Sequence, residues 1–231
     1  MNIKIFADGS NKNEIFDLYK NNKTVVGFTT NPSLMKKAGV KDYRKFIEEV
    51  TGTITDLPIS FEVFADDDEN MLQQAAVISS YGNNVNVKIP ITNTKGDYTF
   101  RVIEKLINNN IKLNITAVFT HKQIDDLRRI LPDNNDTIIS IFAGRISDTG
   151  RNPVHYIDYA LSRLQGKGQI LWASTRHVYN IFEAEEARCH IITVTPDQIK
   201  KLSLQDKDLT EYSLETVKMF YNDAVSSGFS L

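Results

Sequence analysis

Two periodicities of hydrophobic residues alternate along the chain. Short runs with a two-residue period, such as Val85–Pro90, predict strands, and longer runs with apolar residues three or four positions apart, such as Asn11–Tyr19, predict helices. Strands are expected at residues 1–7, 24–29, 59–64, 85–90, 113–119, 137–143, 169–174 and 190–194. Helices are expected at residues 11–19, 32–38, 42–51, 66–81, 96–110, 120–131, 153–164, 177–187, 196–202 and 213–226, with an irregular loop at Gly144-Arg145 and beyond.

A strand followed by a helix, repeated along the whole chain, predicts a parallel sheet. Eight such units within 231 residues predict an α/β fold, a single closed (β/α)8 TIM barrel with an additional C-terminal helix. An open doubly wound sheet is the alternative, but the sequence lacks both GxGxxG and GxxxxGK[ST]. We expect one barrel domain over residues 1–231, in which residues 204–231 form a C-terminal helical extension.

The last predicted helix and the residues after it are more apolar than a free helix should be. The apolar residues concerned are Leu214, Val217, Met219, Phe220, Tyr221 and Phe229. Our hypothesis is that this tail packs across the mouth of the barrel or onto a neighbouring subunit. We therefore expect a homo-oligomer.

Composition narrows the class of protein. Hydrophobic residues make up 41% of the chain, and no apolar run is long enough to span a membrane, so we expect no membrane partner. A formal net charge of −2 with dispersed basic residues argues against nucleic-acid binding. The first residues lack a signal-peptide pattern, and we expect a cytoplasmic protein.

The single cysteine, Cys189, excludes an intrachain disulfide and a CxxC metal or redox site. Its neighbours Arg188 and His190 could activate the thiol, and a packed, unreactive cysteine is the alternative. The acidic run at residues 66–69 could be a metal cluster, and the alternative is the acidic first turn of a helix.

Polar residues in the strands lie opposite the apolar face. In the strand Val85–Pro90, Lys88 takes the face opposite Val87 and Ile89. A buried ammonium is costly unless it is paired or loses its proton, and the alternative is an edge-strand lysine that reaches solvent. Alternate residues of a strand face opposite sides, and we call the choice of residues opposite the apolar face the phase rule. On other strands this rule selects Asp8, Ser60, Glu62, Asn114, Thr116, Ser140 and Phe142.

Each of these residues has an ordinary structural explanation. Asp8 could cap the following helix, Glu62 could merely pair with Lys88, and an inward Ser or Thr is usually bonded to backbone. These explanations do not account for the finding that so many polar residues lie at the same depth on different strands. A lysine, two carboxylates and amides in one water-limited pocket predict imine chemistry, in which the lysine attacks a ketone and the carboxylates move protons.

Two arginines, Arg145 and Arg176, lie just past the sixth and seventh predicted strands, with Ser174 nearby. The loops after late strands are a common phosphate site in barrels, and two arginines with a hydroxyl suit a phosphomonoester. The alternative is that both arginines pair with surface acids.

Five segments resemble the motifs of the transaldolase family, in family order and over most of the chain up to Pro196. Together they form a highly specific set. They are Gly27–Leu34 (GFTTNPSL), Val87–Pro90 (VKIP) followed by Thr94 and Gly96, Leu113–Phe119 (LNITAVF), Ser140–Ile146 (SIFAGRI) with Asp148 and Gly150, and Ala173–Arg176 (ASTR). One departure is Asp8-Gly9-Ser10-Asn11, where the family more often has Asp-Thr/Ser-Ala.

The resemblance implies transfer of a dihydroxyacetone unit between sugar phosphates, without a metal or organic cofactor. Lys88 would form the imine, Asp8 would take the C4 hydroxyl proton, and Glu62 would act as acid and base through a water held with Thr116. The donor would be bound by further residues of the matching motifs. Asn31 and Asn114 would bind the donor hydroxyls, Ser140 would line the donor pocket, and Arg145, Ser174 and Arg176 would hold the phosphate. Thr30 and Phe142 are further substrate-binding residues by this resemblance.

The compact members of this superfamily divide into transaldolases and fructose-6-phosphate aldolases. The aldolases have Gln where this chain has Glu62, and Tyr where it has Phe142, so both positions favour transaldolase. A Schiff-base aldolase is the second hypothesis, distinguished by whether cleavage needs an acceptor aldose phosphate. A non-catalytic phosphosugar-binding barrel is the third, and it would be expected to lack the lysine or a carboxylate.

Overall fold

The computed structural model describes residues 2–230, so the expected strand start at Met1 lies outside the described residues. The chain divides into two compact units, of which the first ends at Ile199 and the second begins at Lys200. The first unit contains all the strands and most of the helices, and the second contains the C-terminal helix.

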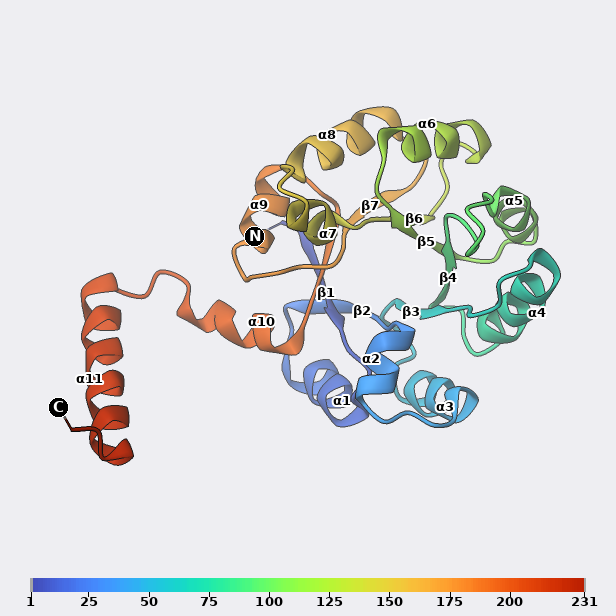
Figure 1. The fold of residues 1–231 in the computed structure, drawn as a ribbon. Coiled ribbons are helices and arrows are strands. Elements are labelled where there is room, and N and C mark those ends of the chain that lie inside the picture. Colours follow the sequence, from blue (N-terminus) through green and yellow to red (C-terminus); the bar gives the residue numbers. More distant parts are fainter. Residues whose placement is uncertain (1, 231) are drawn as a thin grey trace. The chain divides into compact units, whose positions relative to one another are not determined.

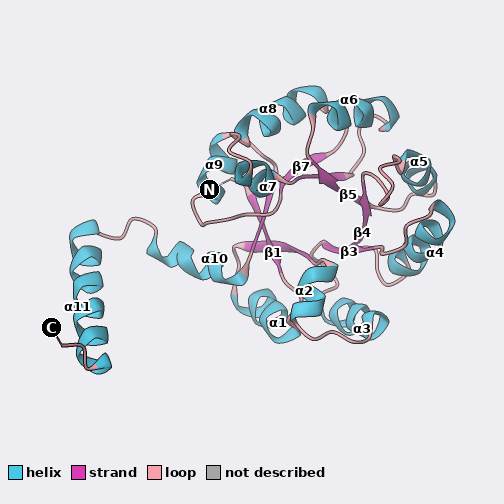
Figure 2. Ribbon diagram, viewed as in Figure 1, coloured by secondary structure: helices cyan, strands magenta, loops and turns pink. Residues whose placement is uncertain are grey.

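Eight parallel strands close into a barrel in chain order, with β8 pairing back onto β1 (Figure 1). The helices of the first unit surround this ring of strands, as Figure 2 shows. The prediction of a TIM barrel with a C-terminal helix is therefore confirmed. The strands are β1 (Lys4–Asp8), β2 (Val25–Thr29), β3 (Ile59–Glu62), β4 (Val85–Pro90), β5 (Leu113–Val118), β6 (Ile138–Ile141), β7 (Gln169–Trp172) and β8 (Ile191–Val194).

Helices follow the strands, and several begin at a polar cap that the sequence supplies. The side chain of Asn11 accepts from the backbone N–H of Asn13, and that of Asp42 accepts from the N–H of Lys45. The helices are α1 (Lys12–Asn21), α2 (Pro32–Lys37), α3 (Tyr43–Thr53), α4 (Asp68–Ser79), α5 (Phe100–Asn108), α6 (His121–Ile130), α7 (Ala143–Asp148), α8 (Val154–Arg163), α9 (Asn180–Glu186), α10 (Pro196–Lys201) and α11 (Leu209–Ser227).

Two expectations about local structure were wrong. The helix expected from Gly96 begins only at Phe100, because Gly96 has a φ of +87° in a turn closed by a bridge between Thr92 and Tyr98. The irregular loop expected at Gly144-Arg145 is the helix α7. Gly144 is needed there for close packing, since a Cβ at this position would lie 1.6 Å from the backbone oxygen of Ser174.

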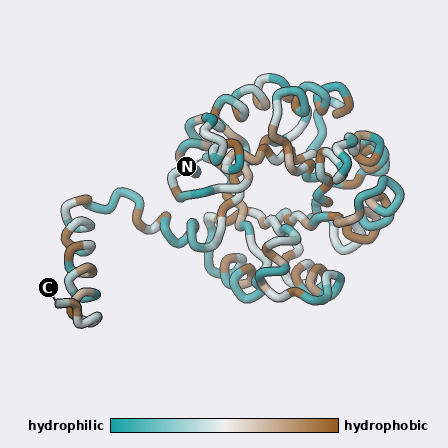
Figure 3. The backbone as a smooth tube through the Cα atoms, viewed as in Figure 1, coloured by the Kyte–Doolittle hydropathy of each residue, from teal (hydrophilic) through white to brown (hydrophobic). Residues whose placement is uncertain are grey.

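The barrel interior has an apolar layer nearer the amino ends of the strands. It is formed by Phe6, Ile138, Leu171 and Ile191, and Ala173, which follows β7, belongs to the same cluster on the side of the carboxyl ends. Gly27 lets the Phe6 ring fill this space, because a Cβ on Gly27 would lie 2.5 Å from that ring. Hydrophobic residues recur along the strands and on parts of the surrounding helices (Figure 3). The polar residues of the strands are thereby concentrated above this layer, toward the carboxyl ends.

The second unit consists of the end of α10, a short 3-10 helix (Leu202–Leu204) and α11. α11 is longer than the expected 213–226, because Asp208 caps it through the backbone N–H groups of Thr210 and Glu211. None of its residues is buried. Within residues 2–230, no helix combines the length and the apolar character that crossing a membrane requires.

Candidate active site

A cavity of about 500 Å³ opens at the carboxyl ends of the strands. This is where the catalytic groups of a (β/α)8 barrel lie, because the loops that follow the strands meet there. Its walls are formed by Asp8, Thr29, Asn31, Pro32, Ser33, Leu34, Glu62, Lys88, Asn114, Thr116, Ser140, Phe142, Arg145, Ala173, Ser174, Thr175, Arg176, Thr193 and Thr195. Eleven of the twelve site residues expected from the sequence are in this set.

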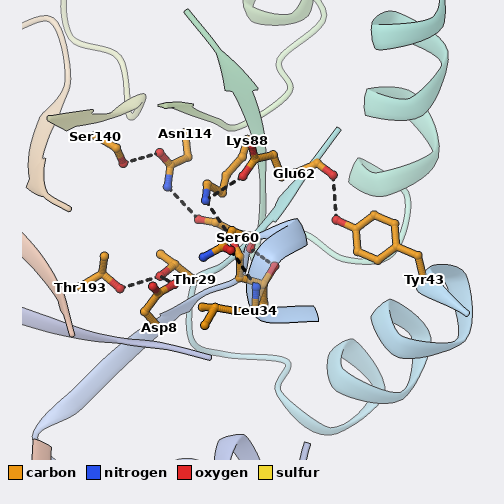
Figure 4. Close-up of polar contacts among 12 residues, drawn as sticks. Asp8, Thr29, Leu34, Tyr43, Ser60, Glu62, Lys88, Asn114, Ser140 and Thr193 are labelled. Carbon is orange, nitrogen blue, oxygen red and sulfur yellow. Dashed lines mark hydrogen bonds and ion pairs between the residues drawn. The ribbon is translucent and has the colours of Figure 1, made fainter. Parts of the chain in front are cut away.

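Lys88 occupies the centre of the polar group shown in Figure 4, and its residue is only 6% exposed. Its ammonium nitrogen lies 3.0 Å from Oε2 of Glu62 and donates to the backbone oxygen of Thr30 at 2.8 Å. Glu62 and Lys88 are register partners on adjacent parallel strands, so both side chains point to the same side of the sheet. The edge-strand alternative for Lys88 is therefore wrong.

Asp8 ends β1 and faces the same cavity. Its Oδ1 accepts a hydrogen bond from the Thr29 hydroxyl at 2.8 Å, and that hydroxyl lies 2.5 Å from the hydroxyl of Thr193. Burial raises the pKa of the Asp8 carboxyl, against the opposing influence of the Lys88 charge and the Thr29 hydrogen bond. Asp8 does not cap the following helix, because Asn11 does so.

A chain of buried hydrogen bonds crosses the site from β6 to β3. The Ser140 hydroxyl donates to Oδ1 of Asn114 at 2.7 Å, and the Asn114 amide donates to the Ser60 hydroxyl at 3.1 Å. Both amide atoms of Asn114 therefore have fixed partners, which sets the orientation of its side chain. The Thr116 hydroxyl is buried and has no partner among the described residues, so it is available to a water or ligand in the cavity.

The β2 loop contributes two expected residues that differ in orientation. The Asn31 side-chain oxygen caps α2 by accepting from the Leu34 N–H at 3.0 Å, which leaves its amide N–H groups for a ligand in the cavity. The Thr30 hydroxyl instead donates to the backbone oxygen of Ser60 at 3.0 Å, and Thr30 does not line the cavity. Thr30 contributes its backbone oxygen, through the bond from Lys88.

Arg145, Ser174 and Arg176 meet on the β6–β7 side of the cavity. Arg176 donates from Nε to Oδ1 of Asp148 at 2.8 Å and from Nη1 to the Ser174 hydroxyl at 3.1 Å. The alternative that the arginines pair with acids is thus correct for Arg176, whose guanidinium lowers the pKa of the Asp148 carboxyl. Arg145 lies over the ring of Phe142, 5.8 Å from its centroid.

Three contact residues were missed by sequence reasoning. Thr193 has the inward phase of β8, which the phase rule could have found, and Thr29 lies within the GFTTNPSL segment. Tyr43 gave no signal, because it is one aromatic residue on an amphipathic helix. Its hydroxyl donates to the backbone oxygen of Glu62 at 2.8 Å.

Within residues 2–230, no group of three or more His, Cys, Asp or Glu side chains could hold a metal ion. In the acidic run, Asp66 accepts from Thr94, Asp67 caps α4, and Asp68 and Glu69 occupy its first turn. Cys189 is buried, and burial raises its thiol pKa to about 12, so the alternative of a packed, unreactive cysteine is correct.

Comparison with known proteins gives the following matches. The family model described as Transaldolase/Fructose-6-phosphate aldolase matches residues 5–231. A probable transaldolase of Caldicellulosiruptor saccharolyticus is 33% identical over 88% of this chain and 92% of its own length. One from Thermoplasma volcanium is 33% identical over 91% and 93%. A solved aldolase structure has a TM-score of 0.56 over 89% of this chain and 97% of its own, and at 11% identity it supports the fold alone.

Proposed function

Since the chain belongs to the transaldolase/fructose-6-phosphate aldolase family, we propose that it is a transaldolase that transfers a dihydroxyacetone unit from a ketose phosphate to an aldose phosphate. Fructose 6-phosphate and sedoheptulose 7-phosphate are the donors of this class. The observation that carries the proposal is the buried amine of Lys88, 3.0 Å from the carboxylate of Glu62, inside a cavity with a second carboxylate. A buried lysine amine in contact with a carboxylate base is suited to attack a ketone.

Imine formation requires Lys88 to lose a proton and the bound ketone to lose its oxygen as water. Glu62 is the base in direct contact with the Lys88 nitrogen. The unpartnered hydroxyl of Thr116 offers a second anchor for a water in the same cavity. In this proposal Glu62 and Thr116 hold that water while Glu62 transfers protons to and from the carbinolamine.

Cleavage of the C3–C4 bond requires a base at the C4 hydroxyl, and we assign that role to Asp8. Its raised pKa makes it a stronger base than an exposed aspartate, and the Thr29 hydroxyl orients one of its oxygens. The proton taken from the C4 hydroxyl is returned when the enamine attacks the acceptor aldehyde. The fixed amide of Asn114 and the hydroxyl of Ser140, together with Asn31, would hold the hydroxyls of the dihydroxyacetone fragment.

The substrate phosphate would bind Arg145, Ser174 and Arg176. Asp148 accepts from both Nε and Nη2 of Arg176, which leaves Nη1 directed to the backbone oxygen and hydroxyl of Ser174 on the cavity wall. A guanidinium held in place loses little side-chain entropy when it binds a phosphate. Sugar phosphates are therefore the partners we propose for this cavity.

Transfer rather than simple lysis is proposed from Glu62 and Phe142, the two positions at which the resemblance distinguishes the two activities. The test is reduction with borohydride in the presence of fructose 6-phosphate, followed by intact mass and peptide mapping. A dihydroxyacetone-sized adduct on Lys88 that disappears on addition of erythrose 4-phosphate would support transfer. An adduct that is indifferent to the acceptor would support the lyase, and no adduct on folded protein would refute imine chemistry with this donor.

A further inference from the structure

A second cavity of about 420 Å³ lies between α2, the α2–α3 loop and the start of α3. We call it the side cavity, and its lining includes Met35, Lys36, Val40 and Tyr43. Pro32 and Glu62 line both the side cavity and the active-site cavity. These two residues therefore form the wall that the cavities share.

Glu62 is held in this wall by contacts to two neighbouring elements. Its carboxylate pairs with Lys88 on β4, and its backbone oxygen accepts the hydrogen bond from Tyr43 on α3. The Tyr43 phenol is available as a donor at any ordinary pH, because burial raises its pKa. Glu62 is thus placed where a molecule in either cavity can approach it.

The side cavity is open to solvent. Lys36, Gly39 and Lys41 on its rim are exposed, so water from the surface reaches it. A water occupies about 30 Å³ in the liquid, so the volume is sufficient for several waters.

Imine chemistry needs such a space because water must move while the sugar is bound. In the proposed complex the sugar would extend from Lys88 to a phosphate at Arg145 and Arg176, which follow β6 and β7 and so lie across the barrel from the β2 and β3 loops. The bound substrate therefore occupies the space through which water would otherwise enter from the main mouth. The side cavity reaches Glu62 from the β2–β3 side, which the phosphate does not cover.

We propose that the side cavity is the route by which water leaves and reaches the imine site through Glu62 while a ketose phosphate fills the active site. The inference rests on the proposed imine mechanism and adds to it a path for water. Lys36 and Val40 line this path without touching the reacting atoms.

Glu62 supplies and accepts the protons in both directions of the reaction along this route. In imine formation, Glu62 donates a proton to the C2 hydroxyl of the carbinolamine, the C2–O bond breaks, and the water departs into the side cavity. In hydrolysis, a water from the side cavity adds to C2 and gives its proton to Glu62. Glu62 passes that proton to the Lys88 nitrogen, the C2–N bond breaks, and Glu62 accepts the C2 hydroxyl proton as the ketone forms.

The test measures exchange of the C2 oxygen of fructose 6-phosphate in ¹⁸O-labelled water, without acceptor. Each cycle of imine formation and hydrolysis exchanges this oxygen, whether or not a C–C bond is cleaved. Lys36→Trp narrows the side cavity from the exposed helix α2, and Lys37→Trp is the matched control, since Lys37 is exposed on the same helix and does not line either cavity. Val40→Phe narrows the cavity from the α2–α3 loop.

We expect exchange at saturating fructose 6-phosphate to fall about tenfold in Lys36→Trp and in Val40→Phe, with little change in KM. Lys37→Trp should exchange like the wild type. The water route would be overturned if Lys36→Trp and Val40→Phe both exchanged at the wild-type rate and melted like the wild type. An equal loss of exchange in Lys37→Trp would also overturn it. A wild-type protein that shows neither exchange nor a borohydride adduct on Lys88 would instead overturn the proposed function.

Discussion

Glu62 and Lys88 are register partners on β3 and β4, and their charged groups lie 3.0 Å apart at the carboxyl end of the barrel. The pair is unequal in exposure, since the lysine side chain is 8% exposed and the glutamate side chain 19%. A buried ion pair contributes little net stability, because each ion loses its hydration. The position of the pair is therefore better explained by chemistry at the amine than by a gain in stability.

Replacing Lys88 with Met should abolish turnover and borohydride trapping while preserving the fold. The Met side chain fills the space of the lysine stem, but it leaves Glu62 without its partner. Because Glu62 retains contact with the cavity, we expect a loss of only about 1–2 kcal/mol in the free energy of unfolding, measured in urea. Lys112→Met is the control, as Lys112 is exposed at the opposite end of the barrel. Turnover above a trace in Lys88→Met would exclude this lysine as the imine former.

Replacing Asp8 with Asn should reduce activity and increase stability. Loss of the proposed general base is expected to lower kcat by about 10²–10⁴-fold. Burial raises the pKa of Asp8 above its ordinary value of 3.8, so the folded state binds this proton more tightly than the unfolded state does. The free energy of unfolding of the wild type therefore falls as pH rises from about 3.8 through the raised pKa, and the variant lacks this fall.

The pH dependence of thermal unfolding tests the Asp8 assignment independently of activity. The melting temperature of Asp8→Asn should exceed that of the wild type near neutral pH, and the difference should shrink below pH 3.8. Asp17→Asn is the control, since Asp17 is exposed on α1. A variant less stable than the wild type at neutral pH would contradict the raised pKa.

The barrel could be predicted from the sequence because its signal is repeated. Each strand–helix unit carries its own period and its own cap or turn, so an error at one boundary leaves the others intact. The wrong elements were those where packing overrides local preference. Gly144 is a poor helix former by itself, and the close approach of the Ser174 backbone, which no sequence window contains, determines its place in α7.

Where strand phase applied, it correctly predicted which strand residues share one cavity. Asp8, Glu62, Lys88, Asn114 and Thr116 have the inward phase, and all line one cavity. The phase rule has no power over loops and helices. It gave no sign that the Thr30 hydroxyl turns to Ser60, that Asp148 holds Arg176 or that Tyr43 bonds Glu62, because each contact joins segments far apart in the sequence.

Replacing Arg176 with Ala should weaken binding of phosphorylated substrates in particular. A hydrogen bond to a charged group contributes about 1.5–3 kcal/mol, so we expect KM for fructose 6-phosphate to rise about 10–100-fold. Unphosphorylated fructose should be affected far less. Asp148→Asn retains the shape of the side chain but removes the charge that pairs with Arg176, so it should give an intermediate rise in KM. An unchanged KM in Arg176→Ala would place the phosphate elsewhere.

The apolar residues of α11 predict self-association. Val217 is 60% exposed and Phe220 62% exposed, which is costly for a helix that stays in water. We expect Phe220→Glu to lower the mass in solution, measured by light scattering, whereas Asn222→Glu on the same helix should leave it unchanged. Deletion of residues 208–231 should have the same effect as Phe220→Glu. An unchanged mass in both, with unchanged kinetics, would exclude a role for α11 in assembly or at the barrel mouth.

Replacing Tyr43 with Phe should affect catalysis through the lost hydrogen bond to Glu62. The substitution removes the hydroxyl that donates to the Glu62 backbone oxygen at 2.8 Å and keeps the ring that contacts Phe64. One lost hydrogen bond of this kind costs about 1 kcal/mol, so we expect a small drop in melting temperature and a fall in kcat of about fivefold. KM for fructose 6-phosphate should change little, since the phosphate and hydroxyl contacts lie on other strands. Tyr19→Phe, which removes a comparable bond to Asp56 outside the active-site cavity, controls for stability. An equal loss of kcat in both variants would show that Tyr43 has no specific effect on Glu62.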